Sequence, residues 1–225
     1  MKHVAAPLPI DVSATCRGYP VADLSLRFDD VIEENYDRML TRIRTFAAER
    51  PLPERVSLEI GSNRANFLRQ LAQRYPERFY LGIEWRKKHV DFGKENMLEH
   101  GVKNADLLQA DATMAIPILL EEGQLSELFI LFPDPWWKKR HRKRRIIQPQ
   151  TLDLFASKMH QGAKLWLRTD VGTLADDFRE VLDAHPEFEL LPFEQMPVEP
   201  FPRTTREVKI LQKGIPVHTL YYVRR

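Results

Sequence analysis

Five acidic residues stand at the ends of apolar segments that are typical of buried strands, and their spacing could support chemistry. They are Glu59, Glu84, Asp111, Asp134 and Asp170. The segments alternate with stretches of helical periodicity, which predicts a mostly parallel sheet with helices on both faces. Because parallel strands bring their carboxyl ends to one edge, we expect the five acids to line one rim, where open α/β sheets bind ligands.

The turn after the first expected strand has the character of a ligand-binding turn. Glu59 and Gly61 lead from this strand into a helix, an arrangement that presents backbone N–H groups to a ligand. A dinucleotide fingerprint would have glycines where Asn63 and Ala65 stand. Asparagine tolerates positive φ better than most residues, so we expect Asn63 to replace one glycine. Glu84 ends the second strand, where an acid binds ribose hydroxyls in nucleoside-binding sheets.

A rigid acidic turn and a dense cation cluster follow the fourth expected strand. Asp134 lies between Pro133 and Pro135, which fix φ and stop both strand and helix. Two tryptophans come next, and then eight basic or potentially basic side chains from Lys138 to Arg145. An acid, flat aromatic surface and cations together indicate a site that binds nucleic acid and acts on it. We expect at least one tryptophan to lie in the core.

Periodicity and turn residues divide the chain into expected helices and strands. We expect residues 1–25 to form an irregular arm and residues 26–225 to form a single domain. The expected helices are 29–50, 66–74, 87–100, 113–122, 149–159 and 174–185, and the expected strands are 55–60, 79–84, 105–110, 128–132, 163–169, 188–191 and 220–223.

Composition restricts the class of protein. The 225 residues are 43% hydrophobic and 29% charged, with a net charge of only +2, so an anionic partner would meet a local basic patch. The single cysteine excludes an internal disulfide framework and a Cys-rich zinc site, and the seven histidines form no ligand-spaced set, so we expect no metal. No apolar stretch approaches the roughly 20 residues that span a bilayer. The first residues lack the long apolar core that is typical of a signal peptide. We therefore expect a cytoplasmic protein that does not associate with a membrane.

These motifs resemble those of the tRNA (guanine-N7)-methyltransferase family over roughly residues 55 to 218. The most specific segment is PDPWWKKRHRKRRIIQP at 133–149, and LEIG at 58–61, LGIE at 81–84, Asp111-Ala112, Thr169-Asp170 and a T-x-x-E segment at 204–207 also match. The resemblance implies a Rossmann-like fold with a mostly parallel seven-stranded sheet and helices on both faces. It also implies a methyltransferase that depends on S-adenosyl-L-methionine. It differs in having Asn63 and Ala65 in the glycine-rich loop and Arg206 where an aromatic residue is usual.

The resemblance also implies roles for individual residues. It implies cofactor contacts from Glu59, Glu84, Asp111 and Asp134, to which the turn adds Gly61 and Asn63. It implies RNA contacts from Lys138, Asp170, Thr204 and Glu207, to which the basic cluster adds Arg142, Arg144 and Arg145 as phosphate ligands.

The implied reaction is methylation of a guanine in the variable loop of tRNA. Guanine N7 carries a free lone pair, so its attack needs no deprotonation and no strong general base. The enzyme must position the base and tolerate the positive charge that forms on it, and we take Asp134 as the catalytic residue, with Asp134 or Asp170 accepting hydrogen bonds from the guanine.

Two alternatives remain open. One is a non-catalytic RNA-binding paralogue without cofactor affinity, although pure RNA binding has no use for Glu84. The other is a nicotinamide-dependent oxidoreductase, which the missing glycines and the basic cluster disfavour. The oligomeric state is open between monomer and homodimer.

Overall fold

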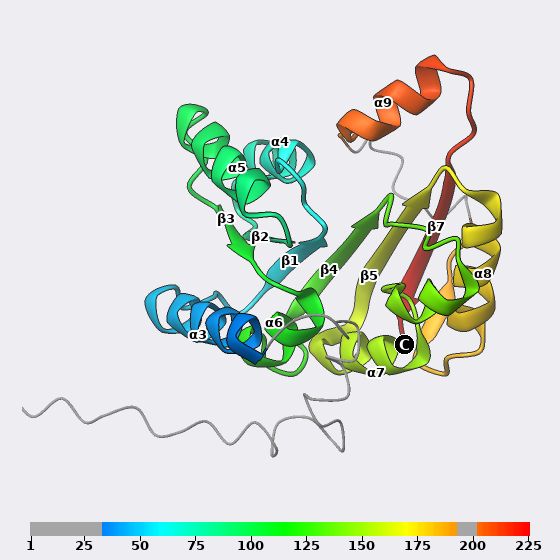
Figure 1. The fold of residues 1–225 in the computed structure, drawn as a ribbon, viewed down its shortest axis with the longest axis horizontal. Helices are drawn as coiled ribbons and strands as arrows, with labels where there is room; N and C mark the ends of the chain where they lie inside the picture. The colour runs from blue at the N-terminus through cyan, green and yellow to red at the C-terminus, as the bar shows by residue number, and fades with distance from the viewer. Residues whose placement is uncertain (1–32, 193–201) are drawn as a thin grey trace, which may run out of the picture.

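A seven-stranded sheet forms the centre of the molecule in the computed structural model, which describes residues 33–192 and 202–225 (Figure 1). The strand order is β3-β2-β1-β4-β5-β7-β6, and only β7 runs antiparallel to its neighbours. The strands are β1 (Val56–Ile60), β2 (Tyr80–Glu84), β3 (Ala105–Gln109), β4 (Leu125–Leu131), β5 (Met159–Thr169), β6 (Phe188–Leu190) and β7 (His218–Arg224). The order reverses between β1 and β4, which is the point where open α/β sheets bind ligands.

Helices cover both faces of this sheet. The helices are α3 (Glu33–Glu49), α4 (Asn66–Arg74), α5 (Lys87–Glu99), α6 (Ala112–Leu119), α7 (Pro149–Lys158), α8 (Gly172–Asp183), α9 (Thr205–Gln212) and the 3₁₀ helix η2 (Lys139–Arg144). The core residues of α4 and α5 belong to one apolar cluster, while those of α3, α6, α7 and α8 belong to the other. Helix α9 lies beyond the carboxyl ends of β4 and β5 (Figure 1).

Alternation along the strands separates the two cores, because successive side chains point to opposite faces. On the α4 side a lateral row of paired positions crosses the sheet through Gly82, Glu59, Phe129, Trp166 and Tyr221. The rings of Phe129 and Trp166 stack with centroids 6.4 Å apart, and those of Trp166 and Tyr221 lie 3.9 Å apart. Glu59 is thus the one acidic position in an otherwise apolar row.

The predicted fold class is confirmed: the sheet is mostly parallel, seven-stranded and covered on both faces. The expected arm at 1–25 and the start of the expected helix at 29–50 lie outside the described residues, and the single domain at 26–225 stays a prediction. The prediction that Trp136 or Trp137 lies in the core was wrong, because Trp136 is half-buried and Trp137 is 68% exposed. Helices α9 and η2 were not predicted. In the described ranges, no helix is both long and apolar enough to cross a bilayer.

Candidate active site

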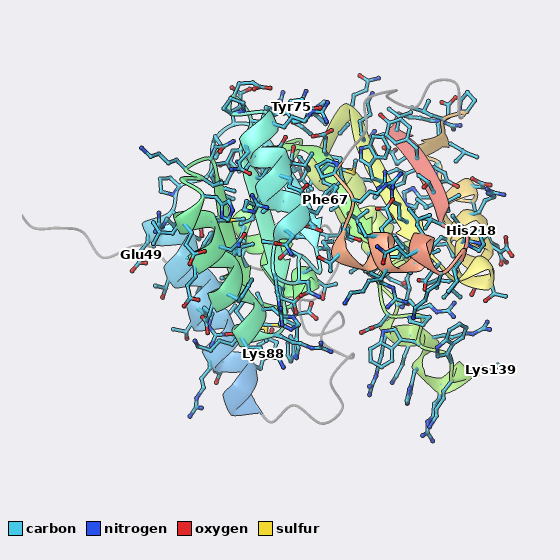
Figure 2. The ribbon with its side chains drawn as sticks, turned by 90° about the horizontal axis from the view of Figure 1, so that it is seen from above. Glu49, Phe67, Tyr75, Lys88, Lys139 and His218 are labelled. Carbon is cyan, nitrogen blue, oxygen red and sulfur yellow. The ribbon has the colours of Figure 1, made fainter. Side chains whose placement is uncertain are left out.

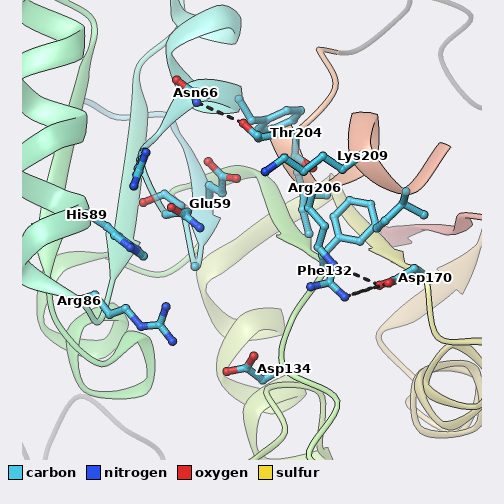
Figure 3. A pocket seen from close by; sticks show the side chains of 18 of the residues that line it. Glu59, Asn66, Arg86, His89, Phe132, Asp134, Asp170, Thr204, Arg206 and Lys209 are labelled. Carbon is cyan, nitrogen blue, oxygen red and sulfur yellow. Dashed lines mark hydrogen bonds and ion pairs between the residues drawn. The ribbon is translucent and has the colours of Figure 1, made fainter. Parts of the chain in front are cut away.

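Two adjoining cavities open at the carboxyl ends of β1, β2 and β4. The larger cavity has a volume of about 790 Å³ and lies between the turn after β1 and helix α9, as Figure 3 shows. The smaller cavity has a volume of about 620 Å³ and lies between the ends of β2, β3 and β4. Gly61, Asn63, Arg86, His89 and Asp134 line both cavities, so the two are compartments of one site.

The turn after β1 uses left-handed backbone conformations. Gly61 has φ of 79°, Asn63 of 50° and Ala65 of 54°. The positive φ predicted for Asn63 is therefore confirmed, and the Asn63 N–H donates to a Glu84 carboxylate oxygen at 2.9 Å. Ala65 carries a cost that sequence reasoning missed, because an L-residue with a Cβ disfavours this region by roughly 1–2 kcal/mol. Gly82 on the neighbouring strand leaves room for the Ser62 side chain of this turn, since a Cβ at residue 82 would lie 2.8 Å from the Ser62 hydroxyl.

Glu84 links the turn after β1 to the turn after β2 at the smaller cavity. Its other carboxylate oxygen accepts a hydrogen bond from the Arg86 N–H at 2.8 Å, and His89 Nδ1 lies 4.0 Å away. Burial lowers the pKa of His89. The Glu84 charge raises this pKa, but nearby cations including Arg86 lower it, and the net shift is downward. The imidazole is therefore neutral at pH 7, and Glu84 remains an acceptor for ligand hydroxyls.

Glu59 is a buried acid in the wall of the larger cavity. Its residue is 3% exposed, and its Oε2 atom is buried with no hydrogen-bond partner among the described residues. Burial raises the pKa of Glu59 to about 8, with the Glu84 charge adding to the effect. The cause is visible in the sheet, since the paired positions on either side are Gly82 and Phe129, which offer no polar group.

Asp111 combines a structural role with a place in the smaller cavity. It is the N-cap of α6, and its carboxylate accepts a hydrogen bond from the Thr113 N–H at 2.7 Å and another from the Thr113 hydroxyl. The cap fixes the carboxylate at the rim beside Ala110 and Ala112.

Asp134 occupies the junction of the two cavities. Phe132 before it and Trp136 after it both have positive φ, at 53° and 47°, so the Pro-Asp-Pro segment forms a sharply bent turn. The Asp134 carboxylate is exposed and has no ion-pair or hydrogen-bond partner among the residues that the structure describes. It is available to a ligand from either compartment.

The basic segment is folded as η2. The Gln148 side chain donates to the Lys143 carbonyl at 2.7 Å and to the Arg145 carbonyl at 2.8 Å, which holds the short helix against the start of α7. Arg144 lies over the Trp136 ring, 5.2 Å from its centroid, and both line the smaller cavity. Lys138, Lys139 and Arg142 are exposed.

Arg145 has a different place from the one expected. Its side chain is only 11% exposed, forms an ion pair with Asp177 on α8 and donates to the Pro135 carbonyl at 3.0 Å. This geometry disagrees with a role as a phosphate ligand. Arg145 instead ties the Pro-Asp-Pro turn to α8, and removal of either member of such a buried pair is costly.

Helix α9 carries the T-x-x-E segment and closes the larger cavity. The Thr204 hydroxyl caps the helix by accepting from the Glu207 N–H at 3.0 Å. Glu207 is 7% exposed and accepts from Arg168 at 2.9 Å. Arg206 donates from Nε to Asp170 Oδ1 at 3.3 Å and from Nη2 to Asp170 Oδ2 at 2.8 Å, so a bidentate fork engages Asp170 (Figure 3).

The structure brings the five strand-end acids to one rim, as expected, but uses several expected RNA ligands internally. Thr204 caps a helix, Glu207 pairs with Arg168, and Arg145 pairs with Asp177. A threonine three residues before a glutamate is a capping signature, and it could have revealed α9 in the sequence. Across residues 33–192 and 202–225, no cluster of three or more His, Cys, Asp or Glu side chains could hold a metal ion.

The fold and the site define a class. Similar solved structures include an S-adenosylmethionine-dependent methyltransferase from Aquifex aeolicus, with a TM-score of 0.52 and 14% identity, covering 92% of this chain and 100% of that one. Precorrin-6y C5,15-methyltransferase from Geobacter metallireducens has a TM-score of 0.53 and 14% identity, covering 88% of this chain and 91% of that one. The chain is a Rossmann-like, S-adenosylmethionine-dependent methyltransferase.

Sequence comparison then places it within that class. Residues 53–220 match a family described as "Putative methyltransferase". The tRNA (guanine-N(7)-)-methyltransferase of Microcystis aeruginosa is 37% identical over 174 residues, which cover 74% of this chain and 82% of that protein. The protein of the same name from Synechococcus sp. (strain JA-3-3Ab) is 35% identical over 179 residues, covering 78% and 75%. This chain belongs to the tRNA (guanine-N7)-methyltransferase family.

The site residues fit the cofactor of this class. Glu84 and Asp111 hold carboxylates at the smaller cavity, where hydroxyl and amino donors of a nucleoside would meet acceptors. The unpartnered buried oxygen of Glu59 at the larger cavity calls for a donor such as an amino group.

Proposed function

We propose that this protein transfers a methyl group from S-adenosyl-L-methionine to N7 of a guanine in the variable loop of tRNA. The observation that carries the proposal is the position of Asp134. Its carboxylate, without a partner among the described residues, lies where the two cavities meet and directly before the cationic helix η2. A base that enters the larger cavity would therefore meet, beside this group, a cofactor that extends from the smaller cavity toward Glu59. We further propose a cytoplasmic protein, either a monomer or a homodimer.

The cofactor would be held by acids that the sheet positions. Glu84 would accept hydrogen bonds from the ribose hydroxyls, because each of its oxygens accepts one backbone N–H, from Asn63 or Arg86, and keeps a further lone pair. Asp111 would provide a further acceptor at the same compartment, and Glu59 would accept from the amino group of the methionine part. When bound, S-adenosyl-L-methionine supplies an electrophilic methyl group. Gly61, at φ of 79°, allows the backbone to turn away beside it.

The reaction asks little proton transfer of the protein. Guanine N7 attacks through a lone pair that is free at neutral pH, so positioning and charge stabilisation dominate. Asp134 would accept a hydrogen bond from the guanine amino edge and stabilise the positive charge that develops on the purine. No other residue at the junction is both acidic and free of partners among those that the structure describes.

The RNA would be held first by η2. Lys138 and Arg142 are exposed and available for phosphates, while Arg144 is oriented by its contact with Trp136. Trp137, 68% exposed, offers a flat surface for an unstacked base. Such contacts release counterions, so affinity should fall linearly with salt on a logarithmic scale.

The test is methylation of unmodified tRNA with isotopically labelled cofactor, followed by nucleoside analysis for 7-methylguanosine. Incorporation confined to that nucleoside supports the proposal. RNA binding without cofactor binding in calorimetry would instead favour the non-catalytic paralogue. Binding of a nicotinamide cofactor in its place would favour the oxidoreductase.

Glu84→Ala provides a sharper arm of the same test. Loss of charge-assisted hydrogen bonds worth about 1.5–3 kcal/mol should weaken cofactor affinity roughly 10- to 150-fold. Glu122→Ala is the matched control, because Glu122 is exposed and precedes the amino end of β4, whereas the site lies at the carboxyl ends of the strands. Equal affinities in the two variants would refute the ribose assignment.

A further inference from the structure

Helix α9 turns a basic face toward the larger cavity. Arg206, Lys209 and Lys213 follow one another at spacings of three and four, so they share one side of the helix, and all three line the cavity. Figure 3 shows the Lys209 side chain reaching into the cavity while Arg206 is held at Asp170. Val208 and Leu211 are exposed instead on other sides of the helix.

The charges around the larger cavity do not balance. Among the acids in its wall, Glu59 is largely protonated at neutral pH and Asp170 is neutralised by Arg206. Lys209 and Lys213 have no ion-pair or hydrogen-bond partner in the described part of the chain. Only Asp134 remains as an unpaired acid in that wall. The α9 side of the cavity therefore has an excess of positive charge, which an anionic group would satisfy.

The helix is fixed well enough to act as a binding surface. Ile210 is 6% exposed and anchors α9 through the side chain between the two lysines. The Asn66 amide donates to the Thr205 hydroxyl at 3.3 Å, and Arg168 pairs with Glu207 at 2.9 Å. These contacts come from α4 and β5, so α9 is held at two sides of the cavity mouth.

We propose that Lys209 and Lys213 form a phosphate-binding site for the nucleotide that flanks the target guanine. The inference rests on the proposed function, since it assigns the anion at the cavity where the target base would enter. A base inserted into the cavity leaves its phosphates at the mouth, and α9 forms one wall of that mouth. Lysine suits this task as a mobile point charge that needs no fixed geometry.

This site is separate from η2. Figure 2 shows Lys139 of η2 well apart from α9. The RNA backbone would thus be held at two places, by η2 beside the smaller cavity and by α9 at the mouth of the larger one. Two separated grips would orient the backbone around the target base, which one cluster cannot do.

The experiment compares the wild type with the double variant Lys209→Gln/Lys213→Gln. The matched control is Arg44→Gln/Lys103→Gln, which also removes two exposed cations that line neither cavity. For each protein, tRNA affinity is measured against salt, cofactor affinity by calorimetry, and folding by the thermal midpoint. Two lost phosphate contacts should lower the slope of log affinity against log salt by about 1.4–1.8 and weaken binding roughly 20-fold at 0.15 M salt. Cofactor affinity should stay the same.

Phosphate ethylation interference locates the contact. In the wild type, ethylation of phosphates flanking the target guanine should block binding, and the double variant should lose this interference alone. An unchanged salt slope in a variant that still methylates tRNA would overturn the inference while leaving the proposed function intact. Weakened cofactor affinity with unchanged RNA affinity would also overturn it, by assigning the lysines to the cofactor carboxylate. Failure of the wild type to methylate any tRNA would instead refute the proposed function.

Discussion

Substitution of Glu59 by glutamine should change how stability depends on pH. In the wild type, burial raises the pKa of Glu59 to about 8, from 4.5 for the exposed group. Above pH 4.5 the unfolded chain has released this proton while the folded chain keeps it until about pH 8. Folding therefore takes up a proton in this window, and the contribution of Glu59 to stability is lost as pH rises. Glutamine mimics the protonated acid at every pH.

The size of the effect follows from the shift. At 1.36 kcal/mol per pKa unit, a rise from 4.5 to about 8 corresponds to a loss on the order of 4–5 kcal/mol across the window. This is a large part of the 5–15 kcal/mol that holds a typical domain together. Near pH 5 the two proteins should have similar unfolding free energies, and near pH 8 Glu59→Gln should be more stable by several kcal/mol.

The assay is chemical denaturation of both proteins at half-unit steps from pH 5 to 8.5, with exposed Glu122→Gln as the control. The expected signature is a stability difference that grows with pH for Glu59→Gln and stays flat for Glu122→Gln. A pH-independent difference would refute the reasoning, because it would mean that Glu59 is already ionised in the folded protein. Adding cofactor should narrow the difference at high pH if its amino group pairs with ionised Glu59.

Three further predictions concern the turn, the sheet and the basic segment. Asn63→Gly with Ala65→Gly should raise unfolding free energy by about 1 kcal/mol, since relief of positive φ exceeds the added unfolded-state entropy, and calorimetry should show the same or better cofactor affinity. Gly82→Ala should cost about 2–3 kcal/mol in denaturation, because its Cβ would lie 2.4 Å from a side-chain carbon across the sheet. Arg145→Gln should lower the free energy of unfolding by about 3 kcal/mol, because it removes one member of the ion pair with Asp177. Arg142→Gln should leave the free energy of unfolding unchanged and flatten the salt dependence of RNA affinity. The reverse pattern would contradict the assignment of the ion pair.

The sheet was predictable because its strands are buried on both faces. Residues 80–83 and 128–131 are continuous runs without a charged side chain, the first followed by Glu84 and the second by the turn that carries Asp134. The acids at the rim followed from parallel topology alone. Strand β4 begins at Leu125 and not at residue 128, since the less apolar start is paired within the sheet and its pattern gave no signal.

The misplaced residues depend on partners far along the chain. Arg145 pairs with Asp177, which lies 32 positions away, and nothing in a run of eight basic residues distinguishes it from Arg142. Trp136 has positive φ after the Pro-Asp-Pro turn, which directs it to the edge of the smaller cavity beside Arg144. Local pattern alone could place neither residue.

Asp170 shows how an expected ligand and an observed ion pair can both belong to one site. Arg206 presents the N–H groups of Nε and Nη2 to the two oxygens of this carboxylate. The guanine edge that carries its ring N–H and amino group presents the same kind of donor fork. Both forks address the same two oxygens, so a guanine that bound Asp170 in this way would compete with the Arg206 guanidinium for them. Once released, Arg206 would stand beside Lys209 and Lys213 on the basic face of α9. Entry of the base would then add a third cation for the RNA backbone, which couples recognition of guanine to the grip on its phosphates.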